Sequence, residues 1–219
     1  MKKEEETTGK NLDEAGLAAL TASTIGHYEH RAEQYRAGTW DHDVRQNLNA
    51  LLRHIDAAPP YRILDLGCGP GRDLVALAAL GHAPVGLDGA ERFCQMARAA
   101  SGCPVLHQDF LALELPPAEF HGVFANAALF HVPVQELLRV IDAVWRTLVR
   151  GGVFFASNPH GDNREGWQGE RYGSYLDYSR WHAIVSAGGF VELEHYYRPA
   201  GEPRHRQPWL ATVFRKPAA

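Results

Sequence analysis

Three aspartates stand at or just after the ends of short apolar runs. Asp65 precedes a glycine loop at 67–71, Asp88 closes the next apolar run, and Asp109 follows the third. Ligands of open parallel sheets bind outside the carboxyl ends of the strands, so we expect the three carboxylates to face one ligand. Asp88 follows the glycines by about 20 residues, where a carboxylate takes ribose hydroxyl groups in doubly wound folds. The set favours a nucleoside that carries a positive charge.

The glycine loop, GCGPG, differs from the loop of dinucleotide-binding enzymes. Its pattern is GxGxG rather than GxGxxG, and Pro70 has no N–H group to donate to a phosphate. Gly67 and Gly69 allow a ligand to lie against bare backbone. The loop therefore disfavours a pyrophosphate and agrees with a ligand that has no phosphate groups.

Asn126 and His131 are the candidate catalytic residues. Asn126 ends the predicted strand 121–125, and His131 begins the next helix. The amide can hydrogen-bond an acceptor ring, and the imidazole can orient or deprotonate one. Each also has a structural interpretation, because Asn126 can cap a turn and His131 can cap the helix. The same two interpretations hold for Asn158, which follows the fifth predicted strand.

Strands and helices alternate along the chain from residue 61 onward. Apolar runs predict strands at 61–66, 83–87, 105–107, 121–125, 153–156, 191–197 and 210–215. Helical periodicity predicts helices at 11–36, 41–58, 74–80, 91–100, 134–149 and 177–187, with Gly151 and Gly152 ending the fifth. This alternation is typical of an α/β fold with a doubly wound, mostly parallel sheet.

The length predicts one domain. We expect residues 1–10 to form a disordered tail and residues 11–219 a single domain, in which 11–58 form an N-terminal helical cap. Residues 158–176 interrupt the alternation with a polar, glycine-rich and aromatic stretch. A stretch of that length in a compact domain is either an active-site insertion or disordered, and its aromatic residues favour the insertion.

Composition disfavours several classes of function. The 219 residues carry a net charge of −4, without the basic footprint of a nucleic-acid-binding protein. No apolar run approaches the length of a membrane span, and residues 1–10 are charged and polar, so we expect neither a span nor a signal peptide. The 12 histidines are scattered without HxH or HExxH pairs, and the three cysteines form no CxxC pair, so we predict no metal site. We expect a cytoplasmic location.

Taken together, DLGCGPGRD, GLDGA, HQDF and FANAALFHV resemble the motifs of class I S-adenosylmethionine-dependent methyltransferases. The resemblance implies a Rossmann-like, seven-stranded sheet with an antiparallel last strand and N-terminal helices over the site. It implies S-adenosylmethionine as cofactor and S-adenosylhomocysteine as product. It implies that the cofactor contacts Tyr28, Tyr35, Asp65, Gly67, Gly69, Arg72, Asp88, Gly89, Asp109, Phe110 and Asn126.

The acceptor is expected to be a small metabolite. FANA replaces the NPPY-type signature of methyltransferases that act on nucleic-acid bases or protein amides. Longer stretches, such as RAEQYRAGTWDHDVRQN and SNPHGDNREGWQGERYG, are similar to the methyltransferase domain of ovothiol biosynthesis. That resemblance implies methyl transfer to an imidazole ring nitrogen of 5-thiohistidine, which yields ovothiol A. It also implies a functional partnership with a separate sulfoxide synthase.

The carboxylate of an amino-acid acceptor needs a cation. Arg171 is our first choice because arginine pairs with carboxylates through two hydrogen bonds. Three further arginines are second choices: Arg198, Arg204 and Arg206. Residues expected to bind the acceptor are Tyr35, Trp40, Asn126, His131, Asn158, Arg171, Tyr172 and Tyr197. Two alternatives stay open: a methyltransferase with another thiol, imidazole or hydroxyl acceptor, and a cofactor-binding module without catalysis.

Overall fold

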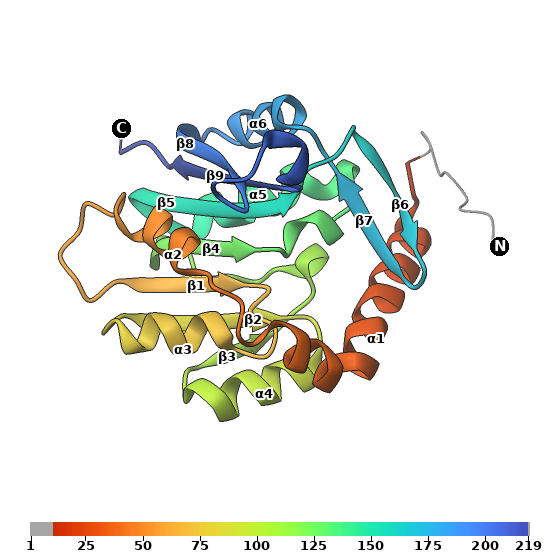
Figure 1. The fold of residues 1–219 in the computed structure, drawn as a ribbon, viewed down its shortest axis with the longest axis horizontal. Helices are drawn as coiled ribbons and strands as arrows, with labels where there is room; N and C mark the ends of the chain where they lie inside the picture. The colour runs from red at the N-terminus through yellow and green to blue at the C-terminus, as the bar shows by residue number, and fades with distance from the viewer. Residues whose placement is uncertain (1–10, 219) are drawn as a thin grey trace.

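The computed structural model describes residues 11–218, in which strands and helices alternate as predicted (Figure 1). The prediction for residues 1–10 lies outside this range. The α-helices are α1 (Glu14–Thr39), α2 (Arg45–Leu52), α3 (Arg72–Ala79), α4 (Glu91–Ser101), α5 (Val134–Thr147) and α6 (Tyr178–Ala187). The strands are β1 (Arg62–Leu66), β2 (Ala83–Asp88), β3 (Val105–His107), β4 (Phe120–Asn126), β5 (Leu148–Pro159), β6 (Arg164–Gln168), β7 (Arg171–Tyr175), β8 (Val191–Arg198) and β9 (Trp209–Arg215). Short 3-10 helices are η1 (Phe110–Ala112), η2 (Leu129–His131) and η3 (Arg204–Arg206).

Seven of the strands form one sheet in the order β3-β2-β1-β4-β5-β9-β8. The pairs from β3 to β5 are parallel, and β9 runs antiparallel to both β5 and β8. The predicted doubly wound sheet with an antiparallel last strand is therefore confirmed. Strands β6 and β7 form a separate two-stranded hairpin.

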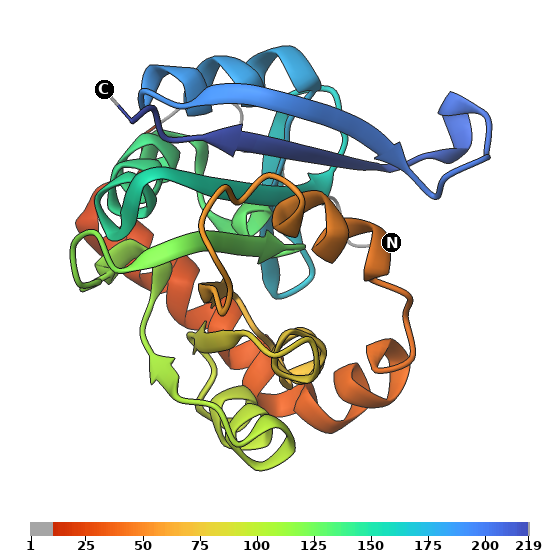
Figure 2. The same ribbon diagram turned by 90° about the vertical axis from the view of Figure 1, so that its left-hand side faces the viewer.

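Helices cover both faces of the sheet because its strands are apolar on both sides. On one face, Phe124 and Phe155 pack against α2 and α3. On the other, Val123 and Phe154 pack against α5 and α6. Helix α4 lies beside α3 against β2 and β3. Figure 2 shows the sheet edge-on between these layers.

The strand order reverses between β1 and β4, and the carboxyl ends of strands at such a switch point form a crevice. Helix α1 crosses this end of the sheet, next to α4 and the β6–β7 hairpin (Figure 1). We call α1 and the hairpin the lid.

Most boundaries shift by a few residues, and three differences from the predictions are larger. Helix α2 ends at Leu52 instead of 58, since 53–58 turn away before the paired prolines. Strand β5 begins at Leu148, so Gly151 lies inside the strand, where its φ of +75° permits an irregular turn, and does not end α5. Most of 158–176 is paired backbone, because β6 and β7 satisfy each other's hydrogen bonds.

Within residues 11–218, no helix combines the length and the apolarity that crossing a bilayer requires. Over the same range, histidine, cysteine and acidic side chains nowhere gather in threes with a geometry that would hold a metal ion.

Gly71 and Gly81 both have a left-handed backbone, but only Gly71 has a close neighbour. Comparing alanine substitutions at the two positions therefore distinguishes the cost of a steric clash from the cost of backbone strain. Gly71 has a φ of +92°, and a Cβ there would lie 2.6 Å from Ala97 Cα, whereas Gly81 has a φ of +83° and open space. We expect Gly71→Ala to lower the free energy of unfolding by about 3 kcal/mol or more, and Gly81→Ala by about 1 kcal/mol. Urea unfolding measures both. Equal losses would show that the contact between α3 and α4 is not tight.

Candidate functional site

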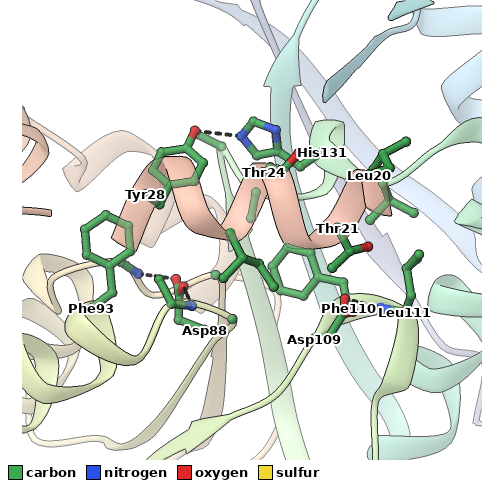
Figure 3. A pocket seen from close by; sticks show the side chains of 18 of the residues that line it. Leu20, Thr21, Thr24, Tyr28, Asp88, Phe93, Asp109, Phe110, Leu111 and His131 are labelled. Carbon is green, nitrogen blue, oxygen red and sulfur yellow. Dashed lines mark hydrogen bonds between the residues drawn. The ribbon is translucent and has the colours of Figure 1, made fainter. Parts of the chain in front are cut away.

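The main cavity lies under α1, at the carboxyl ends of β1, β2 and β3 (Figure 3). Its volume is about 720 Å³, counted with the space at its open mouth. Nine of the predicted site residues line it: Tyr28, Tyr35, Gly67, Gly69, Asp88, Gly89, Asp109, Phe110 and His131. Segments far apart in sequence therefore meet around one space.

Gly67 allows the backbone after β1 to pack against the backbone after β4. Its φ is +82°, and a Cβ there would lie 2.4 Å from the Cβ of Ala128. Any other residue would push the two segments apart. Gly69 has a φ of +52° and donates its N–H to Asp88 Oδ2 at 2.9 Å. The loop therefore brings β1, β2 and β4 together at the cavity floor.

Asp88 is held in place by backbone donors. Gly69 N–H donates to one carboxylate oxygen, and Ala90 N–H donates to the other at 2.9 Å (Figure 3). Burial raises the pKa of Asp88 to about 6. The ionised form accepts hydrogen bonds, so hydroxyl groups of a ligand would stabilise it here.

Asp109 and Phe110 occupy the other side of the cavity. Asp109 Oδ1 accepts the Leu111 N–H at 2.8 Å, which caps η1, and burial raises the pKa of this carboxyl as well. Phe110, the first residue of η1, supplies an aromatic face to the cavity. A flat base fits such a pairing of ring and carboxylate.

The lining fits an uncharged or cationic nucleoside better than a nucleotide. It holds two carboxylates among aromatic and aliphatic side chains, and no Lys or Arg occurs among the described lining residues. A phosphate would lose its hydration without gaining a cationic partner. The predicted preference for a ligand without phosphate therefore agrees with the charges of the cavity.

His131 stands at the cavity wall in one defined tautomer. Its Nδ1 lies 2.6 Å from the Tyr172 carbonyl oxygen, an acceptor, so Nδ1 carries the proton. Nε2 then accepts the Tyr28 hydroxyl at 2.7 Å (Figure 3). Burial lowers the pKa of His131 to about 4, and the Arg171 charge acts in the same direction. The ring is therefore neutral at pH 7.

Arg171 and Tyr172 lie behind this pair instead of in the cavity lining. Arg171 Nη1 is 3.3 Å from Tyr28 Oη, and its guanidinium carbon is 6.0 Å from the Tyr28 ring. Tyr172 is buried against Trp167, with ring centroids 5.6 Å apart. The predicted substrate residues of the hairpin thus reach the site through Tyr28 and His131.

Arg72 and Asn126 belong to a polar network around Asp73, outside the main cavity, and the buried Asp65 lies near its charges. Arg72 pairs with Asp73 through Nε at 2.7 Å and Nη2 at 3.0 Å, and Asn126 Nδ2 donates to Asp73 Oδ2 at 3.2 Å. Asp65 is 1% exposed, and its Oδ2 has no hydrogen-bond partner. Burial raises the pKa of Asp65 well above its usual range, so a cation would stabilise its charge.

Three predicted substrate residues lie elsewhere. Trp40 packs under Arg36, and Tyr197 packs under Arg204, whose guanidinium carbon lies 3.5 Å from the ring centre. Asn158 lines a second cavity, of about 260 Å³, on the side of α5 and α6. The structure does not bring these three side chains to the main cavity.

The inner face of α1 contributes cavity residues that were not predicted from the sequence. Leu20, Thr21, Thr24 and Ile25 line the main cavity together with Tyr28. Their spacing of three and four residues was a readable signal for one face of a helix. Phe93 of α4 also lines the cavity and packs against Tyr28 and Tyr35. No chemical motif marks these residues, because they contribute to the shape of the cavity and not to its chemistry.

Comparisons with known proteins agree with this geometry. Residues 63–152 match the family model of a methyltransferase domain. An uncharacterised methyltransferase of Synechocystis is 33% identical over 112 residues, which cover 50% of this chain and 52% of that protein. The chain thus spans about half the length of this curated relative, and less of a rice 24-methylenesterol C-methyltransferase, of which 29% is covered.

Solved structures extend the likeness to nearly the whole chain. The 1,6-didemethyltoxoflavin N1-methyltransferase of Burkholderia thailandensis, solved with bound 1,6-didemethyltoxoflavin and S-adenosylhomocysteine, matches with a TM-score of 0.79. It is 18% identical, and the match covers 97% of this chain and 94% of that one. At that identity the likeness shows the fold. The cyclase SpnF matches with a TM-score of 0.69 and 16% identity.

The shifted pKa of His131 makes stability depend on pH. The folded protein holds this pKa at about 4, below the usual 6.5, so between these values the unfolded chain binds the extra proton. Stability from this group is present above about pH 6.5 and is lost on acidification. From about pH 7 to about pH 4.5, wild type should lose about 2–3 kcal/mol more unfolding free energy than His131→Gln. Parallel urea-unfolding profiles would contradict a buried, neutral ring.

The switch-point cavity, the glycine loop after β1 and the acidic strand ends occur within or beside the segment that matches the family model. The sheet order and the solved neighbour agree with the same assignment. The chain therefore has the α/β, Rossmann-like fold of class I methyltransferases, and its residues 63–152 match a methyltransferase domain.

Proposed function

We propose that this protein binds S-adenosylmethionine in the main cavity and transfers its methyl group to a ring nitrogen of a small heteroaromatic metabolite. The acceptor that we assign first is 5-thiohistidine, with ovothiol A and S-adenosylhomocysteine as products. The observation that carries the proposal is the neutral, tautomer-fixed His131 beside Tyr28 at the cavity wall.

The residues that would hold the cofactor are those of the cavity floor and side. Asp88 would accept its ribose hydroxyls, and Asp109 with Phe110 would face its base. Asp65 does not line the main cavity, so its contact with the cofactor stays a prediction. When bound, the cofactor supplies an electrophilic methyl group on a sulfonium centre.

The protein's own contribution to the reaction is to orient the acceptor ring. A neutral imidazole nitrogen already has a free lone pair near pH 7, so the reaction does not require a strong base. With its pKa at about 4, His131 is a poor proton acceptor, and its two ring nitrogens already hydrogen-bond Tyr172 and Tyr28. Of the two roles considered for it, we therefore favour orienting the acceptor ring, which His131 would do by holding the Tyr28 hydroxyl in place. Holding the ring in line with the methyl group accounts for much of the rate in such reactions.

Two further observations support the proposed acceptor. The solved Burkholderia neighbour is a 1,6-didemethyltoxoflavin N1-methyltransferase, which transfers a methyl group to a nitrogen. Arg171 beside Tyr28 offers a cation where the carboxylate of an amino-acid acceptor would lie near the lid. The choice of 5-thiohistidine, the partnership with a sulfoxide synthase and the cytoplasmic location rest on the sequence alone.

A second candidate is a domain that binds the cofactor without transferring its methyl group. The likeness to the cyclase SpnF favours this candidate, because the same fold serves a different reaction in that protein. Tight binding of S-adenosylhomocysteine without turnover on any acceptor would identify it.

The acceptor is tested by mass spectrometry. Purified protein and S-adenosylmethionine are incubated with reduced 5-thiohistidine. Parallel incubations contain histidine or the cysteinyl-histidine sulfoxide. We expect one added methyl on 5-thiohistidine alone and an equal amount of S-adenosylhomocysteine. Methylation of another imidazole, a thiol or a hydroxyl compound would support the proposed methyl transfer but show that 5-thiohistidine is not the acceptor.

Arg171→Ala tests the carboxylate partner. Losing a charged hydrogen bond should raise the KM for an amino-acid acceptor by about tenfold or more, with cofactor binding retained. Arg180→Ala, an exposed arginine on α6, is the control and should leave both unchanged. Arg204→Ala tests the alternative at Tyr197. A rise in KM for Arg204→Ala alone would move the carboxylate site to η3.

A further inference from the structure

Three successive hydrogen bonds run through buried polar groups to the carboxyl end of β4. Tyr196 Oη donates to Asn47 Oδ1 at 2.9 Å, and Asn47 Nδ2 donates to Asn126 Oδ1 at 3.0 Å. Asn126 Nδ2 then donates to Asp73 Oδ2 at 3.2 Å. Every donor points toward the Asp73 carboxylate, so each bond polarises the next.

Asn47 is a buried amide on an otherwise apolar helix face. It is 1% exposed, and its neighbours Leu48 and Leu51 pack into the core. A buried amide destabilises a fold unless its polar atoms are hydrogen-bonded, and a leucine here would avoid that cost. The two bonds of Asn47 go to Asn126 and Tyr196, so what the polar side chain contributes is control of these partners.

We propose that Asn47 is a positioning residue for the methyl-transfer site, which fixes the orientation of the Asn126 carboxamide. This inference rests on the proposed function. If the Asn126 amide turned by half a rotation, its NH₂ group would face the NH₂ group of Asn47, and its oxygen would face the Asp73 carboxylate. Both partners select the same orientation. The direction of the carboxamide is then fixed at the end of β4, one residue before Ala127, which lines the main cavity.

The same network reaches the lid. Asp73 holds Arg72 through two bonds, and Arg72 Nη1 donates to the Thr39 carbonyl oxygen, at the last residue of α1, at 2.8 Å. Thr39 Oγ1 donates to the Tyr35 carbonyl oxygen at 2.8 Å, and Tyr35 lines the main cavity. Disorder at Asn126 and Asp73 would therefore loosen the C-terminal end of α1.

Asn47→Asp tests the role with an isosteric change. The aspartate still accepts the Tyr196 hydroxyl but no longer donates to Asn126, whose amide then has conflicting partners. We expect kcat/KM for the acceptor to fall by about tenfold or more. Tyr196→Phe removes the first donor with little change in packing and should cause a smaller fall. Thr147→Val is the matched control, because it removes a buried hydrogen bond to the Pro116 carbonyl oxygen, away from the cavity.

The control should lose stability but keep kcat/KM within about twofold of wild type. Unchanged kcat/KM in Asn47→Asp overturns the proposal, as does a loss no larger than that of Thr147→Val. Amide hydrogen exchange gives a readout without turnover. Exchange in segments 35–43 and 126–131 should rise in Asn47→Asp and Tyr196→Phe but not in Thr147→Val. If wild type methylates no acceptor, the proposed function fails, while the exchange result still decides whether Asn47 positions these segments.

Discussion

The site depends on how closely the backbone after β1 approaches the backbone after β4. At Gly67 the two segments are so close that a single Cβ would overlap Ala128. That contact places the cavity lining of Ala127 and His131 directly across from the glycine loop. Because the strand order reverses there, helices turn away to both sides and leave the crevice open. A bulkier loop would separate the groups that must act on one ligand.

Burial shifts the pKa of the aspartates and of the histidine in the cavity in opposite directions, because it favours the neutral form of each side chain. It raises the pKa of Asp88 and Asp109 and lowers that of His131. In the folded protein, Asp88 therefore holds its proton up to a higher pH, and its contribution to stability falls as the pH rises through about 6, whereas that of His131 falls on acidification. A bound ligand that donates to Asp88 would relieve the first effect. The neutral ring of His131 survives because its hydrogen bonds do not require a charge.

The two parts of the lid are joined to each other by polar contacts, whereas α1 packs on α4 through an apolar cluster around Phe93. Tyr172 N–H donates to Thr24 Oγ1 at 3.1 Å, and Ser23 Oγ donates to the Glu170 carbonyl oxygen at 3.0 Å. Helix α1 buries few side chains, among them Leu20 and Ala32. A cover of this kind separates more easily than a packed core does. The substrate residues expected on the hairpin act behind α1, since the hairpin supports it from outside.

The sequence by itself determined the alternation of strands and helices, the type of glycine loop and the three acidic strand ends. These features are local: an apolar run, a glycine that needs positive φ and a carboxylate at a strand end can be read without knowing the neighbours. Only the tertiary structure decided that Asn126 faces Asn47 and Asp73 instead of the main cavity, and that 158–176 pair as a hairpin. It also separated Trp40, Asn158 and Tyr197 from the site. Side-chain direction and partners depend on which helix packs on which face, and contacts across 79 residues, such as Asn47 to Asn126, leave no local signal.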